Sequence, residues 1–153
     1  MSALLAEPRP VHISGATARL SDAIDAVDRV VRLFQTDGSR VARWRIVNQL
    51  IEARNAFADH ARLCAAESGP LRHVTTQRPR LAPEVRRTLD EHEPILRQVD
   101  GLVASLTVSP ADDGNGVAPL SATLKVSGAL LAHQRRCTGI VYEWANRDIG
   151  GES

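Results

Sequence analysis

Four segments of this 153-residue chain carry apolar side chains at alternating intervals of four and three residues. This spacing gathers each set on one stripe of an α-helix, so each segment predicts an amphipathic helix. The stripes run over Leu20 to Phe34, Ile46 to Cys64, Val85 to Leu106 and Val126 to Trp144. No segment alternates apolar and polar residues as a strand does. We therefore expect an all-α fold, an antiparallel up-down-up-down four-helix bundle.

Helix-ending signals separate the four stripes. Gly38 follows the first stripe, Ser39 is a good N-cap for the second, and Gly69 with its neighbours ends the second. Residues 71–81 hold a proline and polar residues without a period and are predicted to be a loop before Pro83 opens the third helix. Residues 109–119, rich in Asp, Gly and Asn, predict a linker before the fourth helix.

The chain is short enough to form one domain, because separate hydrophobic cores arise only beyond about 250 residues. The bundle is expected over residues 17–146. Residues 1–16, with two prolines and a glycine, predict an irregular N-terminal arm, and residues 147–153, with two glycines, predict a C-terminal tail.

The overall composition narrows the range of partners and compartments. Nineteen basic and 18 acidic residues leave a formal charge of +1, which does not favour binding to a nucleic-acid backbone. No run of about 18 apolar residues occurs, and residues 1–10 contain Glu7 and two prolines, so neither a membrane helix nor a secretory signal is expected. We expect a cytoplasmic protein that binds neither a nucleic acid nor a membrane.

Polar residues interrupt three of the apolar stripes. His60 and Cys64 lie four residues apart in the second helix, and His133 and Cys137 repeat this spacing in the fourth. Side chains four residues apart on a helix lie one above the other on one face, so each pair can bind one metal ion. His92 lies on the third stripe. All five side chains are expected to meet in the centre of the bundle.

Three interpretations of this set are open: a shared metal ion, a disulfide between the two cysteines, and a core without metal. Three buried imidazoles without partners would cost about 1 to 3 kcal/mol each, and a shared metal removes that cost. Stable disulfides are rare in the cytosol. We therefore favour a transition-metal site holding one or two ions, with zinc or iron as the first expectation and copper as a further one, because imidazole and thiolate suit these metals better than magnesium or calcium.

The third stripe also contains a helix-disrupting residue next to its histidine. Pro94 has no backbone N–H, so the carbonyl of Asp90 loses its helical partner. The sequence predicts a kink close to His92.

The spacing of these motifs resembles the hemerythrin-like (HHE cation-binding) domain over roughly residues 20 to 144. The resemblance is carried by His60-x-x-x-Cys64, by the stretch Glu-His-Glu-Pro-Ile-Leu at residues 91–96, and by His133-x-x-x-Cys137. It implies an antiparallel four-helix bundle that holds a non-haem di-iron centre through histidines on all four helices and two bridging carboxylates. In this resemblance the three histidines match the ligands of the second, third and fourth helices.

Two departures from that family alter the expected chemistry. Cys64 and Cys137 stand where the family has its bridging carboxylates, and Val27 is the nearest stripe residue to the missing first-helix histidine. His12 is one candidate replacement, and the acidic residues of the first helix, Asp22, Asp25 and Asp28, are others. Soft thiolates in place of hard carboxylates disfavour oxygen binding at a carboxylate-bridged di-iron centre.

The function expected from the sequence is metal binding at an atypical His/Cys site, with redox or small-molecule chemistry at the metal. Two alternatives stay open. One is a metalloenzyme of specialised metabolism that activates oxygen or a nitrogen oxide. The other is a sensing or binding module in which the metal or the thiols change helix packing without catalysis.

Overall fold

The computed structural model describes residues 11–37, 40–67, 69–108 and 117–147, which are almost entirely helical. The elements are α1 (Val11–Asp37), α2 (Arg40–Ala65), α3 (Pro70–Gln77), the 3-10 helix η1 (Pro79–Leu81), α4 (Ala82–Asp90), α5 (His92–Val108) and α6 (Val117–Arg147). These residues contain no strand, which confirms the expectation of an all-helical fold for the described part of the chain.

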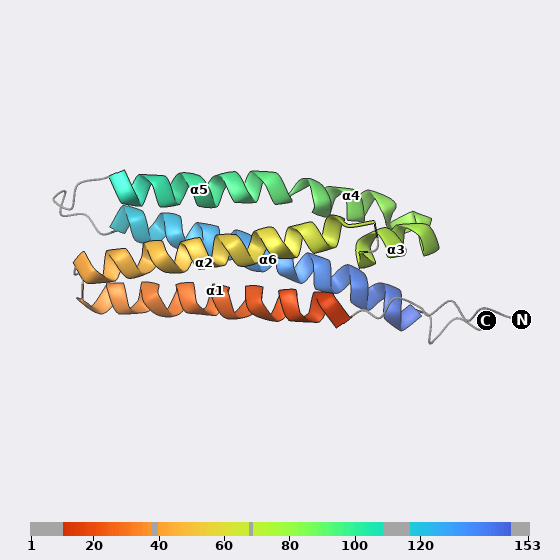
Figure 1. Ribbon diagram of the computed structural model, residues 1–153, viewed down its shortest axis with the longest axis horizontal. Coiled ribbons are helices and arrows are strands. Elements are labelled where there is room, and N and C mark those ends of the chain that lie inside the picture. Colours follow the sequence, from red (N-terminus) through yellow and green to blue (C-terminus); the bar gives the residue numbers. More distant parts are fainter. Residues whose placement is uncertain (1–10, 38–39, 68, 109–116, 148–153) are drawn as a thin grey trace, which may run out of the picture.

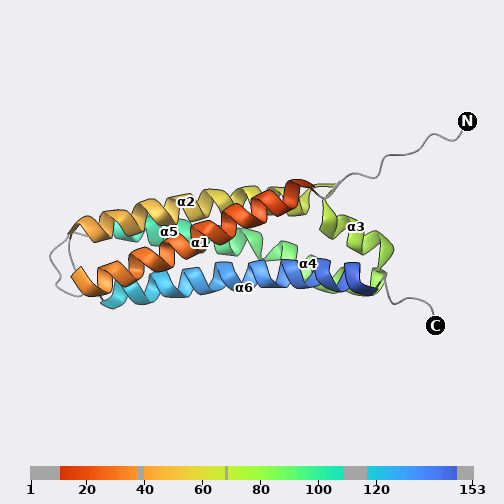
Figure 2. The ribbon, with the colours of Figure 1, turned by 90° about the horizontal axis from the view of Figure 1, so that it is seen from below.

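Four long helices lie side by side, and three short elements gather at one end of them (Figure 1). α1 packs along α2 and also contacts α6, while α5 contacts both α2 and α6. Figure 2 shows α6 on the opposite side of the molecule from α2, with α1 running obliquely between them. The short elements α3, η1 and α4, which we call the cap, all pack against α6 or against one another.

The described helices and surface agree with the composition. None of these helices is both long enough and apolar enough to cross a membrane.

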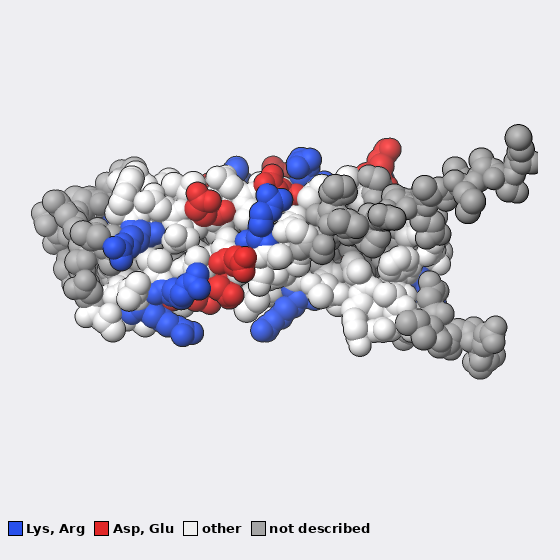
Figure 3. All heavy atoms as spheres, turned by 60° about the horizontal axis from the view of Figure 1, so that its bottom comes forward, with Lys and Arg blue, Asp and Glu red and all other residues white. Residues whose placement is uncertain are grey.

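On the face drawn in Figure 3, basic and acidic side chains are interspersed along the helices and form no continuous field of one sign. A mixed surface of this kind follows from the almost equal numbers of basic and acidic residues.

The predicted apolar stripes form the main core. Leu20, Leu50, Phe57, Val99 and Leu130 are completely buried, and they come from all four long helices. These residues belong to one continuous cluster that runs along the interior. Full burial of such a side chain contributes about 1.5 to 3 kcal/mol, so the four-and-three spacing accounts for most of the packing between the helices.

The loop predicted for residues 71–81 is wrong, because this segment forms α3 and η1 of the cap. Pro70 occupies the first turn of α3, where its missing N–H costs nothing. Leu71 and Val74 are completely buried in a second cluster, which also contains Cys137. Burial of these two residues against α6 stabilises α3. The polar residues around them in the sequence hide the helical pattern.

The single third helix expected from Pro83 onward is divided in two. α4 ends at Asp90, Glu91 forms a turn, and α5 begins at His92. Pro94 therefore lies in the first turn of α5, where no helical donor is required. Glu91 between the two helices keeps helical backbone angles, φ −74° and ψ −20°, so a kink close to His92 stays a prediction.

Helical structure also extends beyond two predicted limits. α1 begins at Val11, inside the segment 1–16 that was expected to be irregular, and α6 begins at Val117, inside the expected linker 109–119. The other expectations for connecting segments lie outside the described residues: the Ser39 cap, the remainder of the arm at 1–10, the linker at 109–116 and the tail at 148–153.

Gly69, in the turn from α2 to α3, is required by close backbone packing. Its N–H donates to the carbonyl of Ala66 at 2.8 Å, and a methyl group at this position would lie 2.5 Å from the carbonyl oxygen of Leu63. Gly69→Ala is expected to lower the free energy of unfolding by about 1 to 3 kcal/mol through this overpacking. Chemical denaturation measures the change.

Gly139 is the matched control, because a methyl group there meets nothing within 4 Å and the residue lies in the interior of α6. Gly139→Ala should raise the free energy of unfolding by about 0.5 to 1 kcal/mol. A Gly69→Ala protein as stable as the Gly139→Ala protein would contradict the packing of this turn.

Candidate metal centre

The five predicted ligands come from three helices and all are buried. α2 carries His60 and Cys64, α5 begins with His92, and α6 carries His133 and Cys137. The exposed fraction is 8% for His92 and lower for the other four. The cysteines belong to the cluster beneath the cap, so this group of side chains lies where the main core meets the cap.

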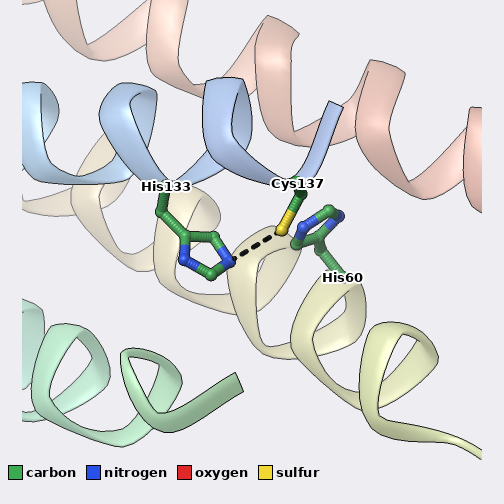
Figure 4. A group of neighbouring side chains, drawn as sticks. All are labelled: His60, His133 and Cys137. Carbon is green, nitrogen blue, oxygen red and sulfur yellow. Dashed lines mark hydrogen bonds between the residues drawn. The ribbon is translucent and has the colours of Figure 1, made fainter. Parts of the chain in front are cut away.

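Three of these residues form a compact group, shown in Figure 4. One potential ligand atom from each of His60, His133 and Cys137 lies within 4.8 Å of the others. The Cys137 Sγ atom is 3.3 Å from His133 Nε2. These three side chains lie close enough to hold a metal ion.

The other two predicted ligands each adjoin one member of the compact group. Cys64 Sγ lies 3.5 Å from His60 Nε2, and His92 Nε2 lies 3.0 Å from His133 Nε2. The structure therefore brings all five into one continuous set of contacts, of which the compact group is the centre. Cys64 and Cys137 are both free thiols, so the disulfide interpretation does not describe this structure.

The residues present fit a transition metal in geometry and in chemistry. Tetrahedral bonds of about 2.0 Å to nitrogen and 2.3 Å to sulfur separate neighbouring ligand atoms by about 3.3 to 3.6 Å. Each cysteine sulfur lies 3.3 or 3.5 Å from the histidine nitrogen of its own helix. In addition, His60 Nδ1 is buried without a hydrogen-bond partner in the described part of the chain, and an unsatisfied buried polar atom costs about 1 to 3 kcal/mol.

Glu91 is a further residue of the site, and no pattern in the sequence predicted its role. Its Oε2 atom lies 3.0 Å from His133 Nδ1, and Arg136 donates to the same oxygen from Nε at 3.1 Å and from Nη2 at 2.8 Å. Glu91 lies in the turn between α4 and α5, and these contacts place it beside α6. The sequence offered only its position next to His92 as a signal.

Two of the buried imidazoles, His92 and His133, are held in the neutral form that binds metals. Burial, with a further contribution from the neighbouring imidazoles His133 and His60, lowers the pKa of His92 to about 4. Burial also lowers the pKa of His133, although the hydrogen bond to Glu91 partly opposes this shift. Burial raises the pKa of Glu91, but hydrogen bonds from His133 and Arg136 outweigh it, so the net shift is downward. At neutral pH His92 and His133 therefore keep a lone pair for coordination.

The two thiols differ in acidity because each affects the other. The neighbouring Cys137 side chain is the main reason that the pKa of Cys64 falls to about 5, and the contact with His60 adds to the effect. The neighbouring Cys64 side chain, together with burial, raises the pKa of Cys137. The pair therefore loses its first proton readily and its second with difficulty, so the metal-free site carries one thiolate at neutral pH.

Two hydrogen bonds fix the level at which α1 lies against α6. Gln134 Nε2 donates to the carbonyl of Thr17 at 3.2 Å, and Ser127 Oγ donates to Asp28 Oδ1 at 2.8 Å. Val27, next to Asp28, therefore lies level with Ser127, about two turns of α6 away from the candidate ligands. The expectation that Val27 occupies the position of the first-helix ligand is wrong. The spacing of apolar residues shows which side of a helix is buried, but it does not show how far along the neighbouring helix each residue lies.

Level with the site, α1 presents apolar side chains. Leu20 and Ala16 flank Thr17 on the buried stripe and are 0% and 2% exposed. Asp22 and Asp25 are exposed to solvent. The side chain of His12 is outside the described part of the structure. The described side chains of α1 thus supply no ligand to the compact group.

Aromatic residues near the end of α6 hold the cap in place. Trp144 Nε1 donates to Gln77 Oε1 at 2.9 Å, and the exposed ring of His73 packs edge-on against Trp144 at 5.4 Å. Tyr142, also near the end of α6, is 69% exposed and lies outside the buried site.

No known family model matches this chain, and no curated protein or solved structure is detectably similar to it. The family resemblance carried by the motifs therefore has no independent support from these comparisons. The function has to be argued from the site itself.

The metal-free protein is expected to show one thiolate per chain in far-ultraviolet absorption. This thiolate should be lost as the pH falls through about 5, because the depressed pKa belongs to Cys64. Cys137→Ala removes the main cause of the shift and should move the midpoint upward, toward that of an ordinary thiol. A thiolate midpoint that Cys137→Ala leaves unchanged would contradict the influence of Cys137 on Cys64.

Proposed function

We propose that this chain is a hemerythrin-like metal-binding protein, an antiparallel up-down-up-down four-helix bundle with an atypical His/Cys transition-metal site and redox or small-molecule chemistry at the metal. The observation that carries the proposal is the compact group of His60, His133 and Cys137, whose ligand atoms lie within 4.8 Å of one another in the buried interior. Groups of ligands on facing helices are the usual way in which bundles build metal sites.

The chemistry of the ligand set supports a transition metal. Imidazole nitrogen and thiolate sulfur suit zinc, iron and copper, whereas magnesium and calcium prefer oxygen. One carboxylate is present, but Glu91 contacts Nδ1 of His133 and not the Nε2 atom that faces the thiol. The proposal therefore names a sulfur-ligated site of one or two ions in place of a carboxylate-bridged di-iron centre.

The surroundings of the site support chemistry on a small molecule. Leu20 and Ala16 of α1 are buried and apolar, so among the described side chains α1 places no competing protein ligand on this side of the site. A metal bound to the other helices would supply an open coordination position for such a molecule. The cap shields the thiols on the other side, because Leu71 and Val74 pack into the same cluster as both cysteines.

Cobalt binding tests the site directly, because Co²⁺ bound by thiolate shows a sulfur-to-metal absorption band. The protein should bind Co²⁺ with this band. Cys137→Ser and His133→Ala should weaken binding by more than the roughly 10- to 100-fold that loss of an outer hydrogen bond causes. Cys64→Ser and His92→Ala remove residues at the edge of the group, and their effect should be smaller.

His73→Ala is the control variant, since this histidine is exposed and packs on Trp144 outside the group. It should bind Co²⁺ like the unmodified protein. Full binding without a sulfur band by the Cys64→Ser, Cys137→Ser double variant would show that the metal is bound elsewhere.

Removal of the metal should lower the melting temperature. A ligand that binds only the folded state at 100 times its dissociation constant stabilises it by about 2.7 kcal/mol. Calorimetry of the loaded protein and of protein treated with a chelator measures the difference. Identical melting of the two samples would favour a core that functions without metal.

A further inference from the structure

The two ring nitrogens of His133 contact different groups. Nδ1 lies 3.0 Å from Glu91 Oε2, toward the surface, whereas Nε2 lies 3.0 Å from His92 Nε2 and 3.3 Å from Cys137 Sγ, in the interior. The His133 side chain is 0% exposed and that of Glu91 is 25% exposed. The imidazole thus connects a carboxylate near the surface with the buried ligand group.

The carboxylate determines which ring nitrogen carries the proton. Glu91 accepts two hydrogen bonds from the guanidinium of Arg136 and, as an ionised carboxylate, has no proton to donate. The proton of the neutral His133 ring therefore resides on Nδ1, which donates to Glu91. This assignment leaves Nε2 with its lone pair pointing into the site.

The surroundings of Nε2 agree with a free lone pair. Two groups that can donate, the His92 ring and the Cys137 thiol, converge on this one atom. In the opposite tautomer, an N–H at Nε2 would point into the group of ligands and occupy the position of a metal. Nδ1 would then face the Glu91 carboxylate without a proton between them, and both groups would lose their hydrogen bond.

The fold brings the carboxylate to this position from a different helix. Glu91 lies in the break between α4 and α5, and Arg136 lies one turn beyond His133 on α6. α6 therefore carries both the imidazole and the cation that holds the carboxylate. Glu91, in the turn before α5, contacts α6 through both of these residues.

We propose that Glu91, held by Arg136, is a positioning residue that fixes His133 in its Nδ1–H tautomer and so keeps Nε2 ready to bind the metal. This inference rests on the proposed function, which names the metal site, and adds the residue that tunes its affinity. Outer hydrogen bonds of this kind fix ring orientation and raise the basicity of the ligand nitrogen.

Three variants test the proposal through Co²⁺ affinity, measured by competition with a chelator. Glu91→Ala should weaken binding about 10- to 100-fold. Glu91→Gln should restore most of the affinity, because its amide oxygen accepts the same Nδ1–H bond without the charge. Glu93→Ala is the matched control, since Glu93 is 81% exposed and forms only an ion pair with Arg97 of its own helix. It should bind like the unmodified protein.

Unchanged affinity in Glu91→Ala would overturn the proposal, as would a Glu91→Gln protein that binds as weakly as Glu91→Ala. Rescue by glutamine separates a tautomer effect from a general loss of stability or charge. Melting curves of the metal-free variants check that each protein is folded at the temperature of the titration.

A second measurement does not depend on metal binding or on any variant. Nitrogen-15 NMR of the metal-free, unmodified protein reports which ring nitrogen of His133 is protonated. A protonated Nδ1 and a bare Nε2 are expected, and a protonated Nε2 would overturn the proposal. If the protein did not bind Co²⁺ at all, the proposed function would fail, while the NMR result would still decide the role of Glu91.

Discussion

Three imidazoles and two thiols are buried between two apolar clusters. The rest of the structure depends on this burial. Phe57 packs against all three imidazoles, with ring centroids 5.2 to 6.4 Å apart. Each buried polar atom needs a partner, and the contacts among the five side chains satisfy most of them. His60 Nδ1 stays unpaired in the described part of the chain. A metal ion would convert these mutual contacts into bonds to a common centre.

The short elements of the structure serve this buried group. The cap encloses the thiols by burying Leu71 and Val74 beside them. Glu91, in the turn before α5, contacts His133 of α6, so that a carboxylate near the surface supports an imidazole in the interior. Packing, helix geometry and hydrogen bonding therefore act together on the same few side chains, and their neutral imidazoles and single thiolate follow from that environment.

The sequence predicted what depends on local periodicity and missed what depends on contacts between helices. The four-and-three spacing identified the buried faces and the two His-x-x-x-Cys pairs. It missed α3 because Leu71 and Val74 become buried only against distant residues of α6. It placed Val27 near the site because a stripe does not reveal how far one helix slides along another, which Gln134 and Thr17 determine here. The role of Glu91 also depends on a contact across 42 positions.

X-ray absorption at the metal edge of the loaded protein tests the central claim most directly, because it identifies the atoms bound to the metal. The account predicts a mixed shell of sulfur at about 2.3 Å and imidazole nitrogen at about 2.0 to 2.1 Å. It also predicts one or two ions per chain. A shell of oxygen and nitrogen without sulfur would contradict a site built on Cys137, His133 and His60, and so would a purified protein that takes up no transition metal.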